Sequence, residues 1–256
     1  MWIDLHVHLY DLSSNDLARC FDNTLKSNVD IVVNTPTSIA TTATVLNQIA
    51  DKPSWYGTVG ISPFDVEVLP ERWREQVKEY TRHEKIIGIG EIGLDNSNPR
   101  YPSIEKQLPV FVDFLALARA ENLPVIMHSR GAEKQVLMLC REHGITRAVF
   151  HCYTGGKKTL KQLLDAGYYV SFSGIVTFKN NPCESLVTYT PLEQLFIETD
   201  SPYLAPEPYR GKQNEPHYVP LIGEKVALLK QLPPEETALQ IRRNFSRLFN
   251  ISISDT

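Results

Sequence analysis

The sequence contains no apolar run that approaches the roughly 18 residues needed to span a membrane. The first predicted strand begins at about residue 2, which leaves no place for the charged and apolar regions of a secretion signal. Low-complexity stretches and a composition typical of disorder are also missing. We therefore expect a cytoplasmic enzyme or binding protein that has no membrane partner.

Cysteine is scarce as well, and a net positive charge is missing. The four cysteines, Cys20, Cys140, Cys152 and Cys183, are widely spread and form no Cys-x-x-Cys pair. This spacing suggests neither a zinc ribbon nor a redox dithiol, and free thiols are expected. A net charge of −4 argues against a surface coated in positive potential, so a polyanionic substrate would need locally clustered cations. Nothing in the sequence implies an obligate protein partner.

The composition that is present is that of an ordinary soluble globular protein, with 42% apolar and 22% charged residues. The length of 256 residues lies at the upper limit of a single domain and matches the usual size of an α/β barrel. We therefore expect one domain over residues 1–256.

Predicted strands and helices alternate along the chain. Short apolar runs rich in β-branched residues, such as Asp30 to Thr35, are typical of strands buried in a parallel sheet. Amphipathic segments lie between them, such as Asn15 to Ser27, which Ser13 or Ser14 precedes as a possible N-cap. The strands are predicted at about 2–8, 30–35, 55–61, 86–91, 124–128, 147–151, 168–172 and 195–200. The helices are predicted at about 15–27, 37–50, 71–83, 104–121, 133–143, 157–166, 183–189, 218–230 and 234–249. Eight such alternations predict a (β/α)8 TIM barrel, in which the active site lies at the C-terminal ends of the strands.

Side chains that bind metal ions recur where these predicted strands end. The set comprises His6, His8, Glu91, His128, His151 and Asp200. The chain has only seven histidines, and four of them end strands. Any one of these residues alone is more often a hydrogen-bonded structural group, but in a barrel all of them converge on one mouth. The pattern therefore predicts a metal site.

A dinuclear site is the natural arrangement of these ligands. Glu91 can bridge two divalent ions through its two oxygens, with His6 and His8 on one ion and His128 and His151 on the other. Asp200 would bind a metal and orient or deprotonate a bound water, whose pKa the ions lower toward neutrality. Glu91 and Asp200 are thus the predicted catalytic residues. Imidazole-rich sites favour Zn²⁺ or Mn²⁺, whereas availability favours Mg²⁺, so the identity of the ions stays open.

Two further carboxylates lie two residues before a predicted ligand and so share its inward side: Asp4 before His6, and Glu198 before Asp200. We expect them to accept hydrogen bonds that orient the ligands, or else to form a structural pair satisfied by the backbone or a shared proton. The run GIGEIG from Gly88 to Gly93 matches a dinucleotide-binding fingerprint, but LDNSNPRYP follows it and cannot form the required helix.

Six motifs in order along the chain resemble the TatD family of metal-dependent hydrolases. They are DLHVH at 4–8, GEIGLD at 90–95, LPVIMHSR at 123–130, HCYTG at 151–155, ETDSPYLAP at 198–206 and RGKQNEP at 210–216. The resemblance implies a cytoplasmic TIM-barrel deoxyribonuclease, commonly a 3′ to 5′ exonuclease that prefers single strands and uses divalent ions. It also implies that the six strand-end residues are the metal ligands.

The chain departs from the family pattern around the substrate. Ser62 stands where a histidine usually precedes proline, Asn96 where an aromatic often follows GEIGLD, and Gly131 where an acidic residue commonly follows His-x-Arg. These departures make nuclease activity less secure than metal-dependent hydrolysis.

Three cations and two aromatic residues are candidates for binding a nucleic-acid substrate. Arg130, Arg210 and Lys212 could hold phosphate oxygens, and the alternative for each is a solvated surface cation. Tyr153 and Tyr203 could stack on bases, although aromatic packing at a barrel rim is equally ordinary.

The leading hypothesis is a metal-dependent hydrolase that cleaves phosphodiester bonds of DNA, because several cations are expected at the mouth. A small-molecule amidohydrolase or lactonase with the same dinuclear site is the second hypothesis. The third is a metal- or nucleic-acid-binding module that has lost turnover, motivated by Ser62, Asn96 and Gly131.

Overall fold

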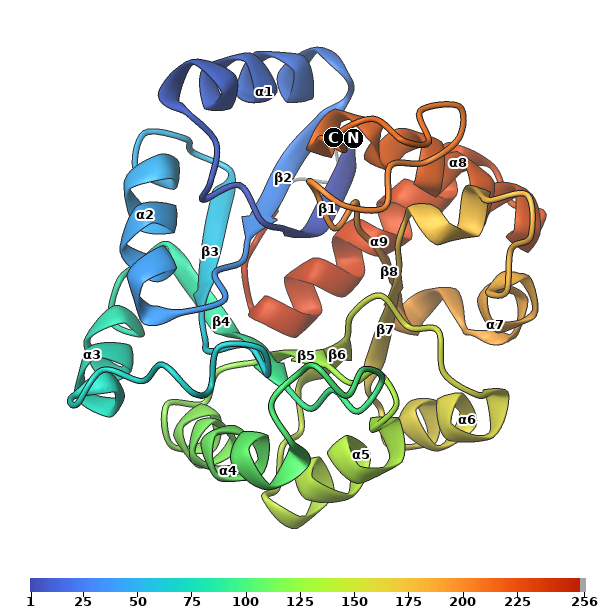
Figure 1. The fold of residues 1–256 in the computed structure, drawn as a ribbon. Helices are drawn as coiled ribbons and strands as arrows, with labels where there is room; N and C mark the ends of the chain where they lie inside the picture. The colour runs from blue at the N-terminus through green and yellow to red at the C-terminus, as the bar shows by residue number, and fades with distance from the viewer. Residues whose placement is uncertain (254–256) are drawn as a thin grey trace.

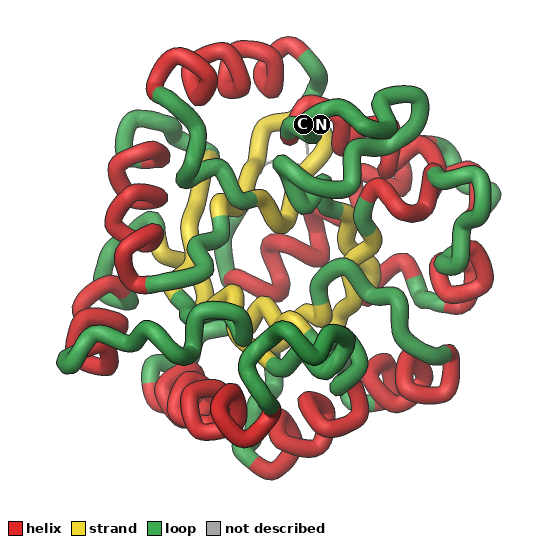
Figure 2. Tube along the Cα trace, viewed as in Figure 1, coloured by secondary structure: helices red, strands yellow, loops and turns green. Residues whose placement is uncertain are grey.

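The structure is a computed structural model that describes residues 1–253. Its core is one sheet of eight parallel strands in the order β1 to β8, rolled into a ring that the helices surround (Figures 1 and 2). This arrangement confirms the predicted (β/α)8 barrel. The strands are β1 (Trp2–Val7), β2 (Val29–Asn34), β3 (Trp55–Val59), β4 (Ile86–Gly93), β5 (Val125–His128), β6 (Ala148–Phe150), β7 (Tyr169–Phe172) and β8 (Leu195–Ile197).

The helices follow the strands at nearly the predicted positions. They are α1 (Ser14–Lys26), α2 (Ile39–Ile49), α3 (Trp73–Tyr80), α4 (Ile104–Ala120), α5 (Glu133–Glu142), α6 (Lys157–Asp165), α7 (Glu184–Tyr189), α8 (Val219–Lys230) and α9 (Pro234–Phe249). Ser13 is the N-cap of α1, and its side chain accepts a hydrogen bond from the Asp16 backbone amide. Each strand is buried on both faces, as expected for a parallel sheet covered by helices.

The strands differ most from the prediction at β8, which ends at Ile197 rather than at residue 200. Asp200 has a φ of 59°, in the left-handed region, so the extended strand cannot continue through it. The residue is therefore held by the loop that follows β8 and not by the strand itself.

β1 and β8 meet at a seam that closes the ring. A single isolated bridge pairs Val7 with Ser201, and the Asp200 amide donates to the His6 carbonyl at 3.0 Å. The Asp4 carboxylate extends this contact, because it accepts hydrogen bonds from the backbone amide of Thr199 at 2.8 Å and from its hydroxyl at 2.6 Å. A side chain thus provides hydrogen bonds at the seam that backbone groups provide elsewhere in the sheet.

Helix α9 closes the end of the barrel where the strands begin. Asn244 donates to the carbonyl of Leu195 at the start of β8, and Arg242 pairs with Asp30 near the start of β2 at 2.7 Å. Phe245 and Phe249 bury their rings there, 4.7 Å apart. The apolar face of α9 therefore covers this end of the barrel, whereas the predicted metal ligands lie at the opposite end.

The glycines of the GIGEIG run belong to β4. A Cβ atom on Gly90 would lie 2.9 Å from the Ile126 side chain, and one on Gly93 would lie 1.9 Å from the His128 carbonyl oxygen. These glycines allow β4 to approach β5 closely, which is a packing role. The next helix after them begins only at Ile104, so no helix N-terminus faces them to bind a dinucleotide.

Between residues 1 and 253, no helix has the length and hydrophobicity to cross a bilayer. All four cysteines, each of them within this range, are free and buried, as the sequence predicts.

Candidate metal centre

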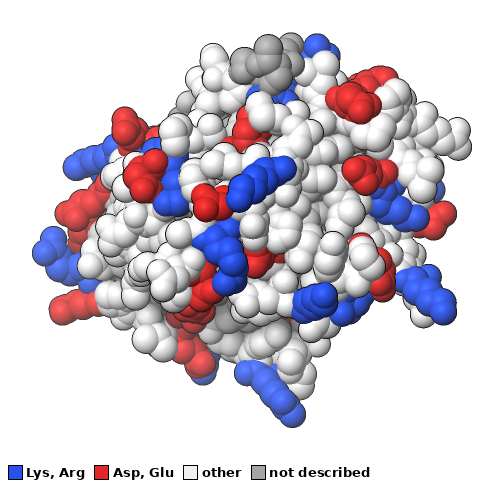
Figure 3. Space-filling model, turned by 90° about the horizontal axis from the view of Figure 1, so that it is seen from above, with Lys and Arg blue, Asp and Glu red and all other residues white. Residues whose placement is uncertain are grey.

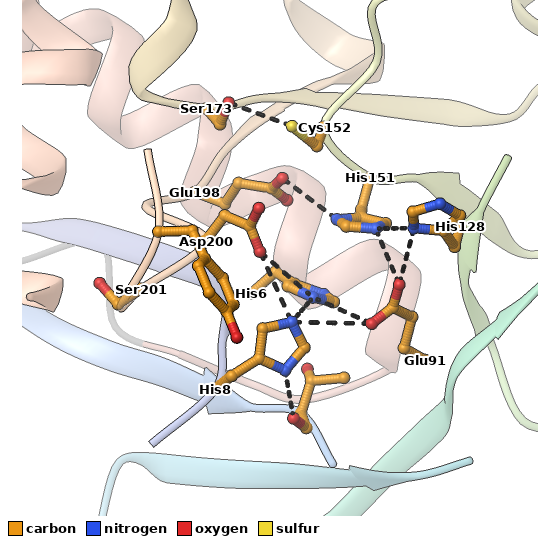
Figure 4. A network of polar contacts seen from close by, with 12 residues as sticks. His6, His8, Glu91, His128, His151, Cys152, Ser173, Glu198, Asp200 and Ser201 are labelled. Carbon is orange, nitrogen blue, oxygen red and sulfur yellow. Dashed lines mark hydrogen bonds and ion pairs between the residues drawn. The ribbon is translucent and has the colours of Figure 1, made fainter. Parts of the chain in front are cut away.

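The six predicted ligands converge at the open end of the barrel (Figure 4). Glu91 and His128 belong to strands, His8 and His151 follow β1 and β6 by one residue, and Asp200 lies three residues beyond β8. His6 is on β1 itself. All six are buried. The segments that carry them are far apart in the sequence, and barrel closure brings them together.

Glu91 stands between two histidine pairs. Its Oε1 lies 2.8 Å from His128 Nδ1 and 3.3 Å from His151 Nε2. Its Oε2 lies 3.6 Å from His8 Nε2 and 3.9 Å from His6 Nε2. One carboxylate oxygen therefore faces each pair, as a bridging ligand requires.

Asp200 approaches the same centre from the seam. Its Oδ1 lies 3.5 Å from His8 Nε2 and 3.9 Å from His6 Nε2. Ligand atoms of three overlapping groups lie within 4.8 Å of one another: His6, His8 and Glu91; Glu91, His128 and His151; and His6, His151 and Asp200. The shared members join them into one continuous cluster.

In three of the histidines, the ring nitrogen that faces away from the centre already makes a hydrogen bond. His8 Nδ1 lies 2.8 Å from the Thr35 carbonyl, His128 Nε2 lies 2.7 Å from Asp95, and His151 Nδ1 lies 3.3 Å from Glu198. A carbonyl or carboxylate oxygen only accepts hydrogen bonds, so each of these nitrogens carries the proton. In the neutral form of each ring the other nitrogen presents a lone pair to the centre, and this is the form that binds a metal ion.

These inward nitrogens need a positive charge between them. His6 Nε2 and His8 Nε2 are 3.0 Å apart, and His128 Nδ1 is 2.8 Å from a carboxylate oxygen. Lone pairs facing each other at such distances repel unless a proton or a cation lies between them. Protonating every ring would place several imidazolium charges in one buried site, which is costly. Imidazole nitrogens and carboxylate oxygens converging in this way fit divalent metal ions.

The pKa values of these side chains also show that the centre favours positive charge beside Glu91. Burial disfavours the charged form of His151, but Glu198 and Glu91 outweigh it and raise its pKa well above the usual value. Burial also opposes ionisation of Glu91, yet His128 and His151 hold its pKa well below the usual value. By contrast, burial and the neighbouring His151 lower the pKa of His6 well below the usual value. The Glu91 side chain is therefore ionised and the His6 imidazole neutral.

The orienting groups around the histidines differ in part from the prediction. Glu198 contacts His151, as expected, and its other oxygen accepts a hydrogen bond from Ser171. Asp4 makes no hydrogen bond to the four histidine side chains and instead accepts from Thr199, so the expectation that it orients a ligand is wrong. The alternative expectation, a structural carboxylate, describes Asp4.

Sequence reasoning missed Asp95 and the Thr35 carbonyl. Asp95 lies two residues beyond β4, and its carboxylate also accepts from the amide and hydroxyl of Ser97. Burial opposes its ionisation, but the hydrogen bonds from His128 and Ser97 outweigh it and lower its pKa. The sequence did contain a signal for Asp95, because it is the last residue of the GEIGLD motif, four positions after Glu91. The Thr35 contact is made by backbone, so no residue type could have indicated it.

A cavity of about 500 Å³ opens directly above the cluster and exposes His8, Glu91 and Asp200. Arg130 lines it, as expected for a residue that follows His128 by two. Arg210 and Lys212 do not line it: the Arg210 guanidinium stacks 3.7 Å from the Phe178 ring, and Lys212 lies over Tyr209. These two cations thus lie outside the lining of this cavity, and their contact with substrate stays a prediction.

Tyr153 is also not available for stacking on a substrate. Its side chain is only 2% exposed, and its hydroxyl donates to the Gly156 carbonyl at 3.0 Å. The structure thus contradicts the predicted substrate contact of Tyr153, whereas Tyr203 lines the cavity and is 59% exposed. On the face that Figure 3 shows, Lys and Arg lie among Asp and Glu without a continuous basic patch.

The three departures from the family pattern have local structural roles. Ser62 is buried, and its hydroxyl donates to Asp65 at 3.1 Å and accepts from the Phe64 amide. Gly131 has a φ of 69°, in the left-handed region that glycine favours, and packs against the Asn96 backbone. Asn96 itself is exposed, and its amide donates to the Arg130 carbonyl at 3.0 Å. The contacts of Asn96 and Gly131 tie the loops after β4 and β5 to each other, and those of Ser62 fix the loop after β3.

The family described as TatD related DNase matches residues 3–250. The chain is 35% identical over 259 residues to the "Uncharacterized metal-dependent hydrolase YabD" of Bacillus subtilis, with 98% of this chain and all of that protein covered. It is 34% identical to the "Uncharacterized metal-dependent hydrolase YcfH" of Escherichia coli, with 98% and 97% covered. The crystal structure of YJJV, a TatD homologue from Escherichia coli, superimposes with a TM-score of 0.91 at 26% identity and covers 98% of both chains.

Proposed function

Because the chain belongs to the TatD family of metal-dependent hydrolases, we propose that it hydrolyses phosphodiester bonds of DNA as a 3′ to 5′ exonuclease on single strands. The observation that carries the proposal is the cluster of inward imidazole lone pairs around Glu91, beneath a cavity that Arg130 lines. Such a cluster suits two divalent ions, and the guanidinium suits a phosphate.

The chain's residues divide into two ligand sets that share one bridge. His6 and His8 would hold one ion, His128 and His151 the other, and Glu91 both. Ions bound there would polarise the phosphoryl oxygens and make a water molecule more acidic. Mg²⁺, Mn²⁺ and Zn²⁺ all suit a mixed imidazole and carboxylate set to different degrees.

Asp200 and Arg130 have separate roles in the proposed reaction. Asp200 Oδ1 points into the centre and takes the proton of the attacking water as its oxygen bonds to phosphorus. The guanidinium of Arg130 binds a non-bridging oxygen and holds the phosphate in line with that water. The bond to the leaving oxygen then breaks, and the proton held by Asp200 is passed through water to that oxygen, which yields a phosphate monoester and an alcohol.

A second candidate function has specific support. Two of the three cations that favoured DNA lie away from the cavity, so its only basic lining residue among those predicted is Arg130. An amide or lactone substrate is uncharged at the bond that is cleaved and needs no arginine or lysine at the cavity. A small-molecule amidohydrolase or lactonase with the same metal ligands is therefore the alternative to a deoxyribonuclease.

One assay separates these candidates and a module without turnover. Purified protein is incubated with 5′-labelled single-stranded DNA and Mg²⁺ or Mn²⁺, in parallel with lactone and amide substrates. We expect stepwise shortening of the DNA that a chelator abolishes. Asp200→Asn should lower the rate at least about 100-fold, and Asp165→Asn, at an exposed aspartate paired with Lys161, should leave it unchanged.

The outcomes differ for each candidate. Cleavage of neither DNA nor simple phosphodiesters, with turnover of a lactone or amide, would replace the proposal by the second function. Metal-dependent binding of DNA without cleavage of any substrate would point to the module without turnover.

A further inference from the structure

The cavity above the cluster has aromatic side chains on two sides. Phe64 and Tyr101 come from the loops after β3 and β4, and Tyr10 and Tyr203 from the loops after β1 and β8. Phe64, Tyr101 and Tyr203 are 36%, 37% and 59% exposed and are thus among the most exposed large apolar side chains of residues 1–253. Three exposed rings around one cavity are not needed for packing the core, so their function lies in what the cavity binds.

The first wall consists of Phe64 and Tyr101. Their ring centroids are 4.5 Å apart, and Phe64 also lies 5.2 Å from His128 in an edge-on contact. The Phe64 backbone is fixed by the buried Ser62 hydroxyl, which accepts from its amide at 3.3 Å. The residue that replaces the family's histidine therefore presents an aromatic ring beside a candidate ligand.

The second wall consists of Tyr10 and Tyr203. Their ring centroids lie 5.9 Å and 6.3 Å from that of His8, another candidate ligand that lines the cavity. The loop that carries Tyr203 is held by the buried Asn214, whose side-chain amide donates to the carbonyls of Thr199 and Tyr203. The exposed ring is thus mounted on an ordered backbone.

The two walls stand on either side of Glu91. The first contacts His128, which faces Glu91 Oε1, and the second contacts His8, which faces Glu91 Oε2. A phosphodiester centred over Glu91 has one nucleoside on each side, and each nucleoside then meets an aromatic wall. Arg130 is the one arginine or lysine among the described residues that line the cavity, so charge alone holds the substrate at one point. Stacking of the bases on the aromatic rings adds further contacts with the substrate.

We propose that the Phe64–Tyr101 wall and the Tyr10–Tyr203 wall each stack on one of the two bases that flank the scissile phosphate. The inference rests on the proposed phosphodiesterase function and specifies its substrate. Every base has a π face, so recognition tolerates any sequence, but a base in a duplex has both faces covered by its neighbours. The arrangement therefore selects single strands and frayed ends with two unstacked bases.

The test compares matched dinucleotides and matched variants. Thymidylyl-thymidine is compared with the two analogues in which one or the other sugar lacks its base, in Mn²⁺, with wild type, Phe64→Leu, Tyr203→Leu and Tyr189→Leu. Tyr189 is an exposed tyrosine outside this cavity and serves as the control. The thermal midpoints of all variants confirm folding.

Loss of either base should lower kcat/KM roughly 5- to 150-fold in the wild type, the range expected for one stacked base. Phe64→Leu and Tyr203→Leu should each show a similar loss on the intact dinucleotide, and each should lose little more when the base on its own side is absent. Tyr189→Leu should behave as wild type. In an Asp200→Asn background, fluorescence anisotropy of labelled oligothymidylate should show the same loss of affinity without turnover.

Hydrolysis of intact and abasic dinucleotides with equal kcat/KM, or unchanged values in both cavity variants, would overturn the inference and leave the phosphodiesterase standing. Absence of hydrolysis for every phosphodiester, the intact dinucleotide included, would overturn the proposed function. In that case equal oligothymidylate affinities of the cavity variants and the control would also refute the stacking walls.

Discussion

The two ends of the barrel differ in the chemistry of their side chains. Where the strands begin, α9 covers the opening with Phe245 and Phe249, and the charged pair of Arg242 and Asp30 is neutralised internally. Where the strands end, histidines and carboxylates converge beneath an open cavity, in an arrangement that suits metal ions. One end is thus packed mainly with apolar side chains, and the other with polar side chains that can bind a cation.

Because of this difference, we expect the closed end to contribute mainly to folding stability and the open end mainly to metal binding and catalysis. The closed end gains free energy from apolar burial, which acts on folding alone. The open end holds polar groups whose burial is costly until a cation binds. Substitutions at the two ends should therefore change different measured quantities.

The largest effect is expected at the open end from Glu91→Gln. The amide keeps the shape but loses the charge that faces both histidine pairs, so hydrolysis should fall about 1000-fold or more while the barrel stays folded. Rates on single-stranded DNA and circular dichroism measure the two quantities. Glu67→Gln, at an exposed glutamate paired with Lys106, is the matched control. Activity within tenfold of wild type in Glu91→Gln would remove Glu91 from the site.

A comparable effect on stability is expected at the closed end from Phe245→Ala. Removing a fully buried ring should lower the free energy of unfolding by about 3–5 kcal/mol, while metal affinity stays unchanged. Urea unfolding and calorimetric titration with Mn²⁺ measure these. Leu228→Ala, on the exposed side of α8, should cost less than about 0.5 kcal/mol. A large loss of metal affinity in Phe245→Ala would show that the two ends are coupled.

The smallest of the three effects is expected from Asp95→Ala, because Asp95 acts through His128. Without the acceptor at 2.7 Å, the His128 ring loses its fixed orientation and proton position, and metal affinity should fall about 10- to 100-fold. Nitrogen chemical shifts of His128 should show a mixture of tautomers. Asn98→Ala in the same loop should leave both quantities unchanged. An unaltered affinity in Asp95→Ala would mean that the metal alone orients His128.

Much of the fold could be predicted from the sequence because each buried strand is a short apolar run between amphipathic segments. The ring follows from eight such repeats. The position of α9 could not be predicted, because its periodicity shows one apolar face and not which end of the barrel that face covers. The length of β8 was also wrong, since the left-handed conformation of Asp200 leaves no mark on an apolar pattern.

For the candidate site, residues on strands could be placed from the sequence, whereas loop residues could be placed only in part: Asp200 and Tyr153 both lie three residues beyond a strand, and only Asp200 reaches the centre. A strand fixes the direction of its last side chains, so His6, Glu91 and His128 converge as expected. Loop residues have no such constraint: Tyr153 turns inward into the core, and Arg210 turns away onto Phe178. Their side-chain directions depend on contacts made by the folded loops.

The seam between β1 and β8 sets an order of events during synthesis of the chain. Asp4 and its partner Thr199 are 195 residues apart, and the flanking His6 and Asp200 span a similar separation. At 5–20 residues per second, the ribosome reaches the second half of the centre roughly 10–40 s after the first. Until then β1 has an unpaired edge and its histidines have no Asp200 beside them. The cluster of candidate ligands is therefore complete only when the last strand joins the first.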